Sequence, residues 1–218
     1  MGALYLLRRP ERVIVSDFYN SVIGLMPWIK QGHPAYGLPV GEVYCYLVNK
    51  YLKPRSTIIE RVDEFYNRYL ADTLYIAVHV RGSDKQLELS QLGEINQRYF
   101  SQIDAMLPDK SHKIFLLSDS AEIIEEFRRR FGSRLVTTLC QRSPDQTGTH
   151  HMPVSCSRAQ LGIEVMVDTY LAARAACFIG NGASNVSCFV RYLKNWNKGE
   201  YRLMVSSMHH LRAPALYS

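Results

Sequence analysis

The residues best suited to chemistry directly follow an apolar strand. The segment LYIAVHV, residues 74–80, is aliphatic on both faces and leads into His79, Arg81 and Asp84. A guanidinium just past a buried strand offers a rigid fork of N–H donors that matches two phosphate oxygens, which a lysine does not. Arg81 therefore indicates a diphosphate site, although an ion pair with Asp84 in a surface turn is the simpler interpretation. His79 is either a ligand-binding group or a core histidine with satisfied hydrogen bonds.

Two further polar turns follow apolar strands. The segment GNGASNVS, residues 180–187, is a glycine-rich turn that opens a helix, with Ser184 at the expected N-cap. Backbone N–H groups and the helix dipole at such a turn favour an anion, but the same pattern is typical of an ordinary capped turn. The second turn, Ser118-Asp119-Ser120, ends the strand KIFLLS.

Asp168 interrupts a long apolar segment, GIEVMVDTYLAARAACFIG, in which little water is expected near its carboxylate. A buried carboxylate needs hydrogen-bond partners. Two interpretations are open. The partner of Asp168 is either a backbone N–H or Arg174 within the protein, or the edge of a bound nucleotide base with two adjacent N–H donors, which guanine has and adenine lacks.

The elements that must position these groups alternate between strand and helix patterns from residue 56 onward. This alternation predicts an α/β fold, a Rossmann-like parallel sheet with helices on both faces. The predicted strands are residues 74–80, 113–118, 134–139, 177–180 and 201–206, and the predicted helices are residues 56–71, 95–107, 121–131, 162–175 and 184–195. In such a sheet the ligand binds beyond the carboxyl ends of the strands, where all the polar turns would meet.

Two capping patterns mark predicted helix starts. Thr57 is followed three residues later by Glu60, and Asp119 by Glu122. Residues 1–55 are less regular, and one helix is expected near residues 43–52.

Composition narrows the classes of protein. The chain has 218 residues, 47% of them hydrophobic, but no run of about 18 apolar residues, so we expect a globular protein without a membrane span. Its five cysteines are widely spaced without a C-x-x-C pair, which favours a reducing, cytoplasmic location, or the secretory pathway if the chain is a fragment. The net charge of +6 makes anionic partners plausible, yet no basic stripe with interleaved aromatic residues predicts nucleic acid binding.

Three of these features together resemble the GDP-fucose-dependent fucosyltransferases, both the α-1,6 type, which includes the rhizobial nodulation enzymes, and the protein O-fucosyltransferases. The first is His79-Val80-Arg81-Gly82-Ser83-Asp84 after an apolar strand. The second is FLLSDS at residues 115–120, and the third runs from Val167-Asp168 to Ser184-Asn185. The resemblance covers residues 74 to about 195.

The resemblance implies the C-terminal donor-binding domain of a GT-B glycosyltransferase at residues 56–218, with residues 1–55 as a linker or a remnant of the acceptor-side domain. It implies inverting transfer of fucose from GDP-fucose to a glycan or glycoprotein hydroxyl, with no metal and no cofactor. Arg81 and His79 would bind the diphosphate, and Asp168 would read guanine. The other donor-binding residues implied are Asp84, Asp119, Ser184 and Asn185.

The acceptor hydroxyl must lose a proton, and Glu88, four residues after Asp84, is the candidate base, although an exposed loop glutamate is the simpler interpretation. Two departures from the family pattern stand out: some α-1,6 enzymes have a second arginine where Gly82 stands, and the segment before residue 74 is short for a complete N-terminal domain. The alternatives are a catalytically inactive GDP-sugar-binding module and a basic nucleic acid-binding domain.

Overall fold

A five-stranded, fully parallel sheet forms the centre of the computed structural model, which describes residues 9–12, 22–82, 92–107, 111–144 and 157–205. The strands lie in the order β3-β2-β1-β4-β5. Their bounds are β1 (Tyr75–His79), β2 (Lys113–Leu117), β3 (Leu135–Val136), β4 (Cys177–Gly180) and β5 (Tyr201–Leu203). The predicted Rossmann-like parallel sheet is confirmed, and each strand lies within its predicted range, although β3 and β5 are shorter than predicted.

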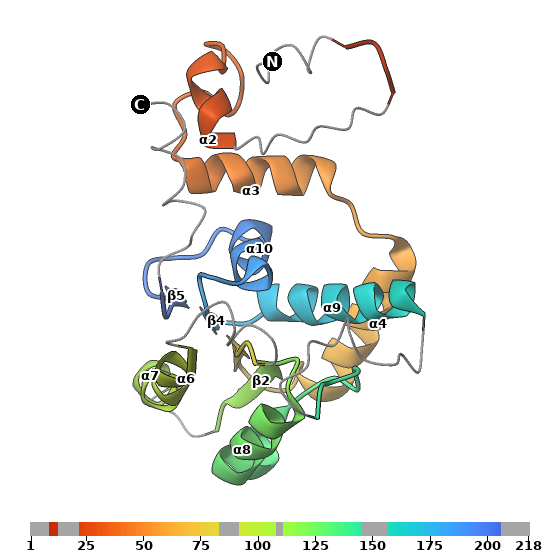
Figure 1. Cartoon of the computed structure of the whole chain (residues 1–218), viewed down its shortest axis with the longest axis vertical. Coiled ribbons are helices and arrows are strands. Elements are labelled where there is room, and N and C mark those ends of the chain that lie inside the picture. Colours follow the sequence, from red (N-terminus) through yellow and green to blue (C-terminus); the bar gives the residue numbers. More distant parts are fainter. Residues whose placement is uncertain (1–8, 13–21, 83–91, 108–110, 145–156, 206–218) are drawn as a thin grey trace.

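Helices cover both faces of the sheet. The elements before β1 are α2 (Val22–Leu25), η1 (Met26–Trp28), α3 (Val40–Tyr51) and α4 (Ser56–Tyr69); those after it are α6 (Leu92–Gln97), α7 (Tyr99–Met106), α8 (Ala121–Phe131), η2 (Gly132–Arg134), α9 (Arg158–Ala173) and α10 (Asn185–Leu193). The core on one face contains residues of α7 and α8, and the core on the other face contains residues of α4, α9 and α10. In Figure 1, α8 lies at the bottom of the molecule and α10 lies above β4. None of the described helices is both long and apolar enough to cross a membrane.

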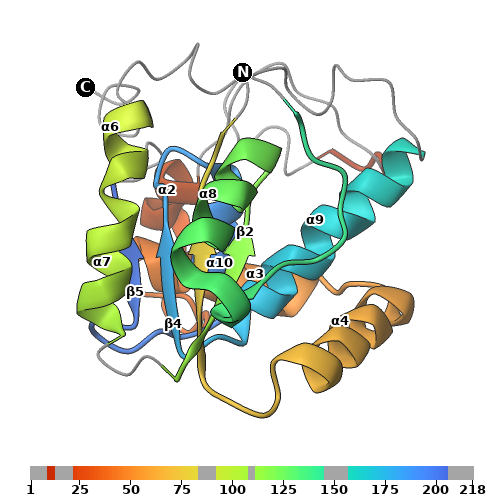
Figure 2. The same cartoon turned by 90° about the horizontal axis from the view of Figure 1, so that it is seen from below.

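The apolar residues of β1 alternate between two cores, which is why both faces need a helix layer. Tyr75 and Ala77 pack with buried residues of α4, α9 and α10, and Ile76 and Val78 pack with α7 and α8. All five residues of β1 are buried, as a central parallel strand requires. Figure 2 shows the same arrangement from below, with α8 in front of the strands and α10 behind them.

The strand order places a topological switch between β1 and β4. The chain leaves β1 for the helices on one face and leaves β4 for α10 on the other face. The two strands pair in parallel, with Val78 opposite Ile179. A crevice therefore opens between their following loops, where open α/β sheets bind ligands.

Several local predictions need correction. Arg55, and not Thr57, is the N-cap of α4, and it makes no side-chain cap. Ser120, and not Asp119, caps α8, because its hydroxyl accepts the N–H of Ile123. The helix expected at residues 95–107 is two helices, broken at Arg98.

The strand expected at residues 134–139 pairs only at Leu135 and Val136. The strand lies at the edge of the sheet, so it has a partner on one side only. Thr138 is consequently in the loop after the strand, and it contributes to the site described below.

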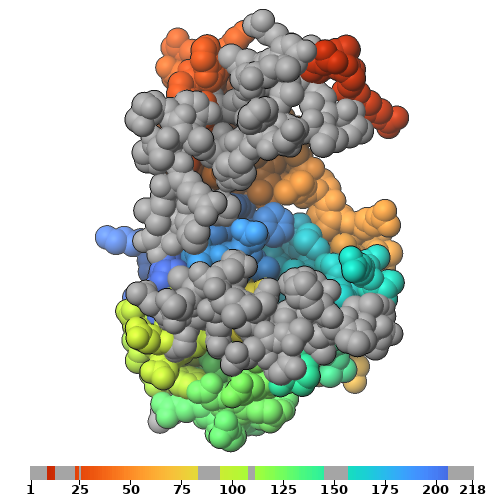
Figure 3. Space-filling model, viewed as in Figure 1, coloured from red at the N-terminus to blue at the C-terminus, as the bar shows by residue number. Residues whose placement is uncertain are grey.

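The helix expected near residues 43–52 is confirmed as α3, which packs against α10. The rings of Tyr44 and Tyr192 stack with centroids 4.7 Å apart, and Asn49 Nδ2 donates to the Tyr192 carbonyl at 3.1 Å. Figure 3 shows these N-terminal residues at the end of the molecule opposite to α8. The role of residues 1–55 as an acceptor-side remnant stays a prediction.

Leu171→Ala is expected to destabilise the protein by about 2–5 kcal/mol, because the side chain is fully buried between α9 and the sheet and its loss leaves a cavity. Leu74→Ala is the matched control, since the Leu74 side chain is 62% exposed and its truncation should change stability by less than about 0.5 kcal/mol. Urea unfolding of the three proteins measures both values. Equal effects of the two substitutions would contradict the assignment of the core.

Candidate functional site

Two adjoining cavities lie at the carboxyl edge of the sheet. The inner cavity, about 110 Å³, is lined by His79 and Arg81 after β1, by Asp119 after β2 and by Asp168 of α9. The outer cavity, about 270 Å³, lies between α4, α9 and the loop after β3. Cys140, Glu164 and Asp168 line both cavities, so they mark the junction between them.

The Arg81 guanidinium lines the inner cavity only, and it forms an ion pair with Asp119. Its Nη1 is 2.8 Å from Asp119 Oδ2, with the two side chains 26% and 13% exposed. The other oxygen, Oδ1, accepts the N–H of Gly82 at 2.8 Å. One carboxylate thus fixes both the backbone after β1 and the side chain that points from it. Arg81 has Asp119 as an ion-pair partner, and the position of Asp84 lies outside the described residues.

Gly82 is required where it stands. A Cβ at this position would lie 2.6 Å from Ser120 Cβ and 2.9 Å from Ile123 Cδ1. An arginine at position 82, which some α-1,6-fucosyltransferases have, would require the start of α8 to shift. The glycine lets the turns after β1 and β2 approach closely enough for the contact with Asp119.

His79 is buried and neutral beside the guanidinium. Burial lowers its pKa to about 4, so the ring carries no charge at pH 7. Its Nδ1 lies 2.7 Å from Ser187 Oγ, which also accepts the N–H of Asn181 at 3.0 Å. Either Nδ1 or the Ser187 hydroxyl can be the donor in this contact, because the direction depends on the tautomer of the ring. His79 is therefore suited to contribute a neutral polar group to the inner cavity and not to supply charge.

The start of α10 lies beside this histidine, although its two predicted ligand residues do not line the inner cavity. Ser184 is the N-cap, as predicted, but makes no side-chain cap and is buried. Asn185 is exposed. Val186 lines the cavity from this helix instead. Gly180 allows the close packing, because a Cβ there would lie 2.5 Å from Ser187 Oγ.

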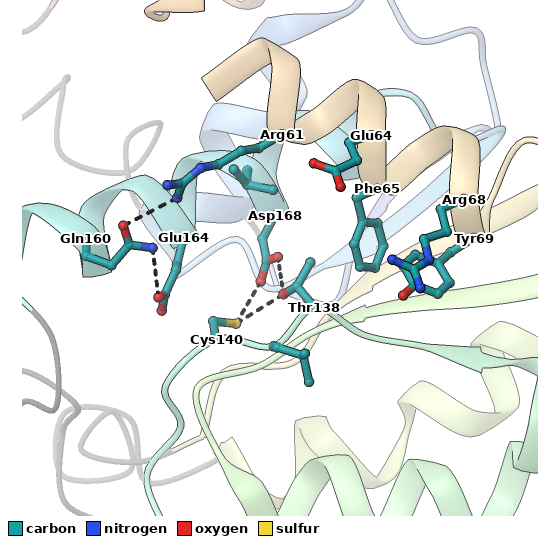
Figure 4. A pocket seen from close by; sticks show the side chains of 12 residues that line it. Arg61, Glu64, Phe65, Arg68, Tyr69, Thr138, Cys140, Gln160, Glu164 and Asp168 are labelled. Atoms are coloured by element: carbon teal, nitrogen blue, oxygen red, sulfur yellow. Dashed lines mark hydrogen bonds between the residues drawn. The ribbon is translucent and has the colours of Figure 1, made fainter. Parts of the chain in front are cut away.

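Asp168 is a buried carboxylate held by two residues of the loop after β3 (Figure 4). Thr138 Oγ1 donates to Oδ1 at 2.5 Å, and Cys140 Sγ lies 3.5 Å from Oδ2. Desolvation nevertheless raises the pKa of Asp168 to about 6. The alternative prediction that Arg174 is the partner of Asp168 is wrong, because the Arg174 guanidinium forms an ion pair with Asp63 at 2.5 Å.

The loop after β3, which carries Thr138 and Cys140, is held in place by hydrogen bonds of its own. Arg142 donates to the carbonyls of Thr138 at 2.8 Å and Cys140 at 3.1 Å. The N–H of Ser143 donates to the Asp119 carbonyl at 2.7 Å, which ties the loop to the end of β2. The geometry around Asp168 is thus linked to the turn that holds Arg81.

Sequence reasoning missed three residues of the site: Thr138, Cys140 and Glu164. The only signal for Thr138 was a pair of threonines at the end of a predicted strand, where polar residues face the ligand edge. Glu164 is one helical turn before Asp168, so the two carboxylates share a helix face.

The predicted site residues thus divide into three groups. His79, Arg81, Asp119 and Asp168 line one cavity, while Ser184 and Asn185 lie at the adjacent helix start. Asp84 and the predicted base Glu88 lie outside the described residues. Among the described residues, no cluster of three His, Cys, Asp or Glu side chains is placed to hold a metal ion.

The fold and the cavities together define a Rossmann-like domain with a polar cavity at the carboxyl edge of its sheet. No protein-family model matches the chain. No curated protein sequence matches it either.

Solved structures similar to this chain are fucosyltransferases. NodZ α-1,6-fucosyltransferase co-crystallised with GDP is 26% identical, with a TM-score of 0.45, over 68% of this chain and 44% of that chain. The fucosyltransferase NodZ from Bradyrhizobium is likewise 26% identical, with a TM-score of 0.44 over the same shares. POFUT1 in complex with GDP-fucose is 18% identical, with a TM-score of 0.47, over 75% of this chain and 48% of that chain. The chain spans less than half the length of these proteins.

Asp168→Asn is expected to stabilise the ligand-free protein at pH 7.5. The folded state raises the pKa of this carboxyl from 3.8 to about 6, so the wild-type protein loses stability as the pH rises through this window. The loss reaches about 3 kcal/mol above pH 6, and asparagine avoids it while still accepting from Thr138.

Urea unfolding between about pH 4 and pH 8 tests this linkage. The gain of Asp168→Asn should grow with pH and vanish near the acidic limit. Glu64→Gln, at an exposed carboxylate of α4, is the control and should show no such trend. A variant that is less stable than wild type at every pH would contradict the expectation.

Proposed function

We propose that this chain is the donor-binding domain of a GT-B-like glycosyltransferase that transfers fucose from GDP-fucose to a hydroxyl of a glycan or protein. The observation that carries the proposal is that Arg81 and Asp168, 87 positions apart in the chain, line the same cavity at the carboxyl edge of the sheet. A cation suited to a diphosphate and a carboxylate suited to a guanine edge therefore lie in one site.

The arrangement fits the two ends of a guanine nucleotide. The inner cavity offers a guanidinium, a neutral histidine and the nearby start of α10 to the diphosphate. Asp168, ionised above about pH 6, accepts two hydrogen bonds, as the N1–H and amino group of guanine require. Adenine presents a ring acceptor at the position of the guanine N1–H and would set it against the carboxylate, so the second hydrogen bond would be lost.

In the proposed reaction the acceptor oxygen forms a bond to the anomeric carbon of fucose while the bond from that carbon to the β-phosphate oxygen breaks. The electron pair leaves with GDP, and the acceptor proton passes to a base, for which Glu88 remains the candidate. A single displacement inverts the anomeric carbon. Arg81 stabilises the growing charge on the leaving diphosphate more than the ground state, so the reaction needs no metal ion.

The remaining donor contacts belong to this proposal as well. Ser184 and Asn185 would contact the phosphates from the start of α10, and Asp84 would lie near the diphosphate. Asp119 would act by holding Arg81 in place, since both of its oxygens face the turn after β1.

GDP is expected to protect the protein from thermal unfolding, and ADP and UDP much less. At a hundred times its Kd, a ligand adds about 2.7 kcal/mol, which corresponds to about 5–10 °C for a domain of this size. Arg81→Ala should abolish the shift, because the diphosphate loses its main cation.

Arg128→Ala is the matched control for this scan, because Arg128 lies on α8 in an exposed pair with Glu125, away from the cavities. It should keep the full GDP shift. Equal protection by all three nucleotides, or protection that survives Arg81→Ala, would exclude the proposed site.

Transfer itself is tested by release of GDP from GDP-fucose, with and without a panel of oligosaccharides and hydroxyl-bearing protein domains. Release that depends on an acceptor is the expected result, and Arg81→Ala should lower it by at least about a hundredfold, as removal of a charge-stabilising donor does elsewhere. Binding of GDP-fucose without release in any mixture would favour the inactive GDP-sugar-binding module.

A further inference from the structure

Two carboxylates lie one helical turn apart at the junction of the cavities. Glu164 and Asp168 are both on α9 and both line the inner and the outer cavity. Like charges at this spacing repel each other. Within the described ranges, neither has a lysine or arginine nitrogen at ion-pair distance, although the charge of Arg142 acts on Asp168 from farther away and favours its ionised form.

Glu164 is half-buried and only partly satisfied. Its Oε2 accepts the N–H of Gln141 at 3.1 Å, and its Oε1 accepts from Gln160 Nε2 at 3.2 Å, as Figure 4 shows for the second contact. A carboxylate has about four acceptor positions, so each oxygen retains room for another O–H or N–H donor.

The other two junction residues are less suited to accept new hydrogen bonds. Asp168 and Glu164 each already face two protein donors, but in the proposed function the remaining acceptor positions of Asp168 are assigned to the base. Burial raises the pKa of the Cys140 thiol to about 11, so it stays protonated and is a weak acceptor. Glu164 is therefore the junction group with free acceptor capacity.

The order of chemical groups in a nucleotide decides what meets Glu164. With the diphosphate at Arg81 and the base at Asp168, the ribose lies between these two residues in the inner cavity, which Glu164 also lines from the helix face it shares with Asp168. Its 2′- and 3′-hydroxyls are donors, which complement a carboxylate that lacks a cation.

We propose that Glu164 accepts a hydrogen bond from the ribose of the bound guanine nucleotide and thereby selects ribonucleotides over deoxyribonucleotides. This inference rests on the proposed function and adds a specificity residue to it.

The test compares the Kd values of GDP, 2′-deoxy-GDP and 3′-deoxy-GDP by calorimetry. For the wild-type protein, at least one deoxy analogue should bind about ten- to a hundredfold more weakly than GDP, the range for a hydrogen bond to a charged group. Glu164→Gln keeps an acceptor for Gln141 but loses the charge, and should reduce the ratio to roughly threefold.

Glu164→Met removes the acceptors at similar size and should bring the ratio to about one, as expected when the hydroxyl has no partner to lose. Glu60→Gln is the control: this carboxylate is exposed on α4, lines neither cavity and should leave the ratio unchanged. Far-ultraviolet circular dichroism checks that each variant is folded, and the wild-type ratio tests the inference even if a variant is not.

The outcomes separate the two proposals. GDP binding with equal affinity for the deoxy analogues, or a ratio that survives both Glu164 substitutions, overturns the ribose contact and leaves the proposed function standing. Absence of GDP binding by the wild-type protein overturns the proposed function, and the ribose contact with it.

Discussion

A carboxylate kept away from water organises the ligand edge of this domain. Asp168 lies on a helix that must also pack against the sheet, so its charge is desolvated and its pKa rises to about 6. The fold tolerates this because Thr138 and Cys140 reach the carboxylate from a loop that Arg142 pins. A group that is held at a stability penalty in a cavity is a strong candidate for function.

The second constraint is the close approach of the turns that follow β1 and β2. Asp119 binds Gly82 N–H with one oxygen and Arg81 with the other, and this needs the absence of a side chain at Gly82. The same carboxylate both orients the guanidinium and competes for it. A diphosphate in the inner cavity would meet a preorganised cation whose charge is already partly balanced, which favours a ligand that carries more than one negative charge.

Most of the architecture follows from local patterns. The strands around Ala77, Phe115 and Phe178 are apolar on both faces, which only a buried parallel strand explains, and each is where it was predicted. Helix starts were less predictable, because neighbouring Ser, Thr and Asp residues compete for the cap. At α8 the N-cap is Ser120, whose hydroxyl accepts the N–H of Ile123. The Asp119 carboxylate instead accepts the N–H of Gly82 in the turn after β1.

By itself, the sequence determined the class of fold, the edge of the sheet where a ligand belongs and four polar residues that meet there: His79, Arg81, Asp119 and Asp168. It did so because strand periodicity and polar strand ends are local signals. Only the tertiary structure decided their partners. Thr138 reaches Asp168 across 30 positions and Ser187 reaches His79 across 108, and such contacts depend on strand order and on how closely the chain packs at Gly82 and Gly180.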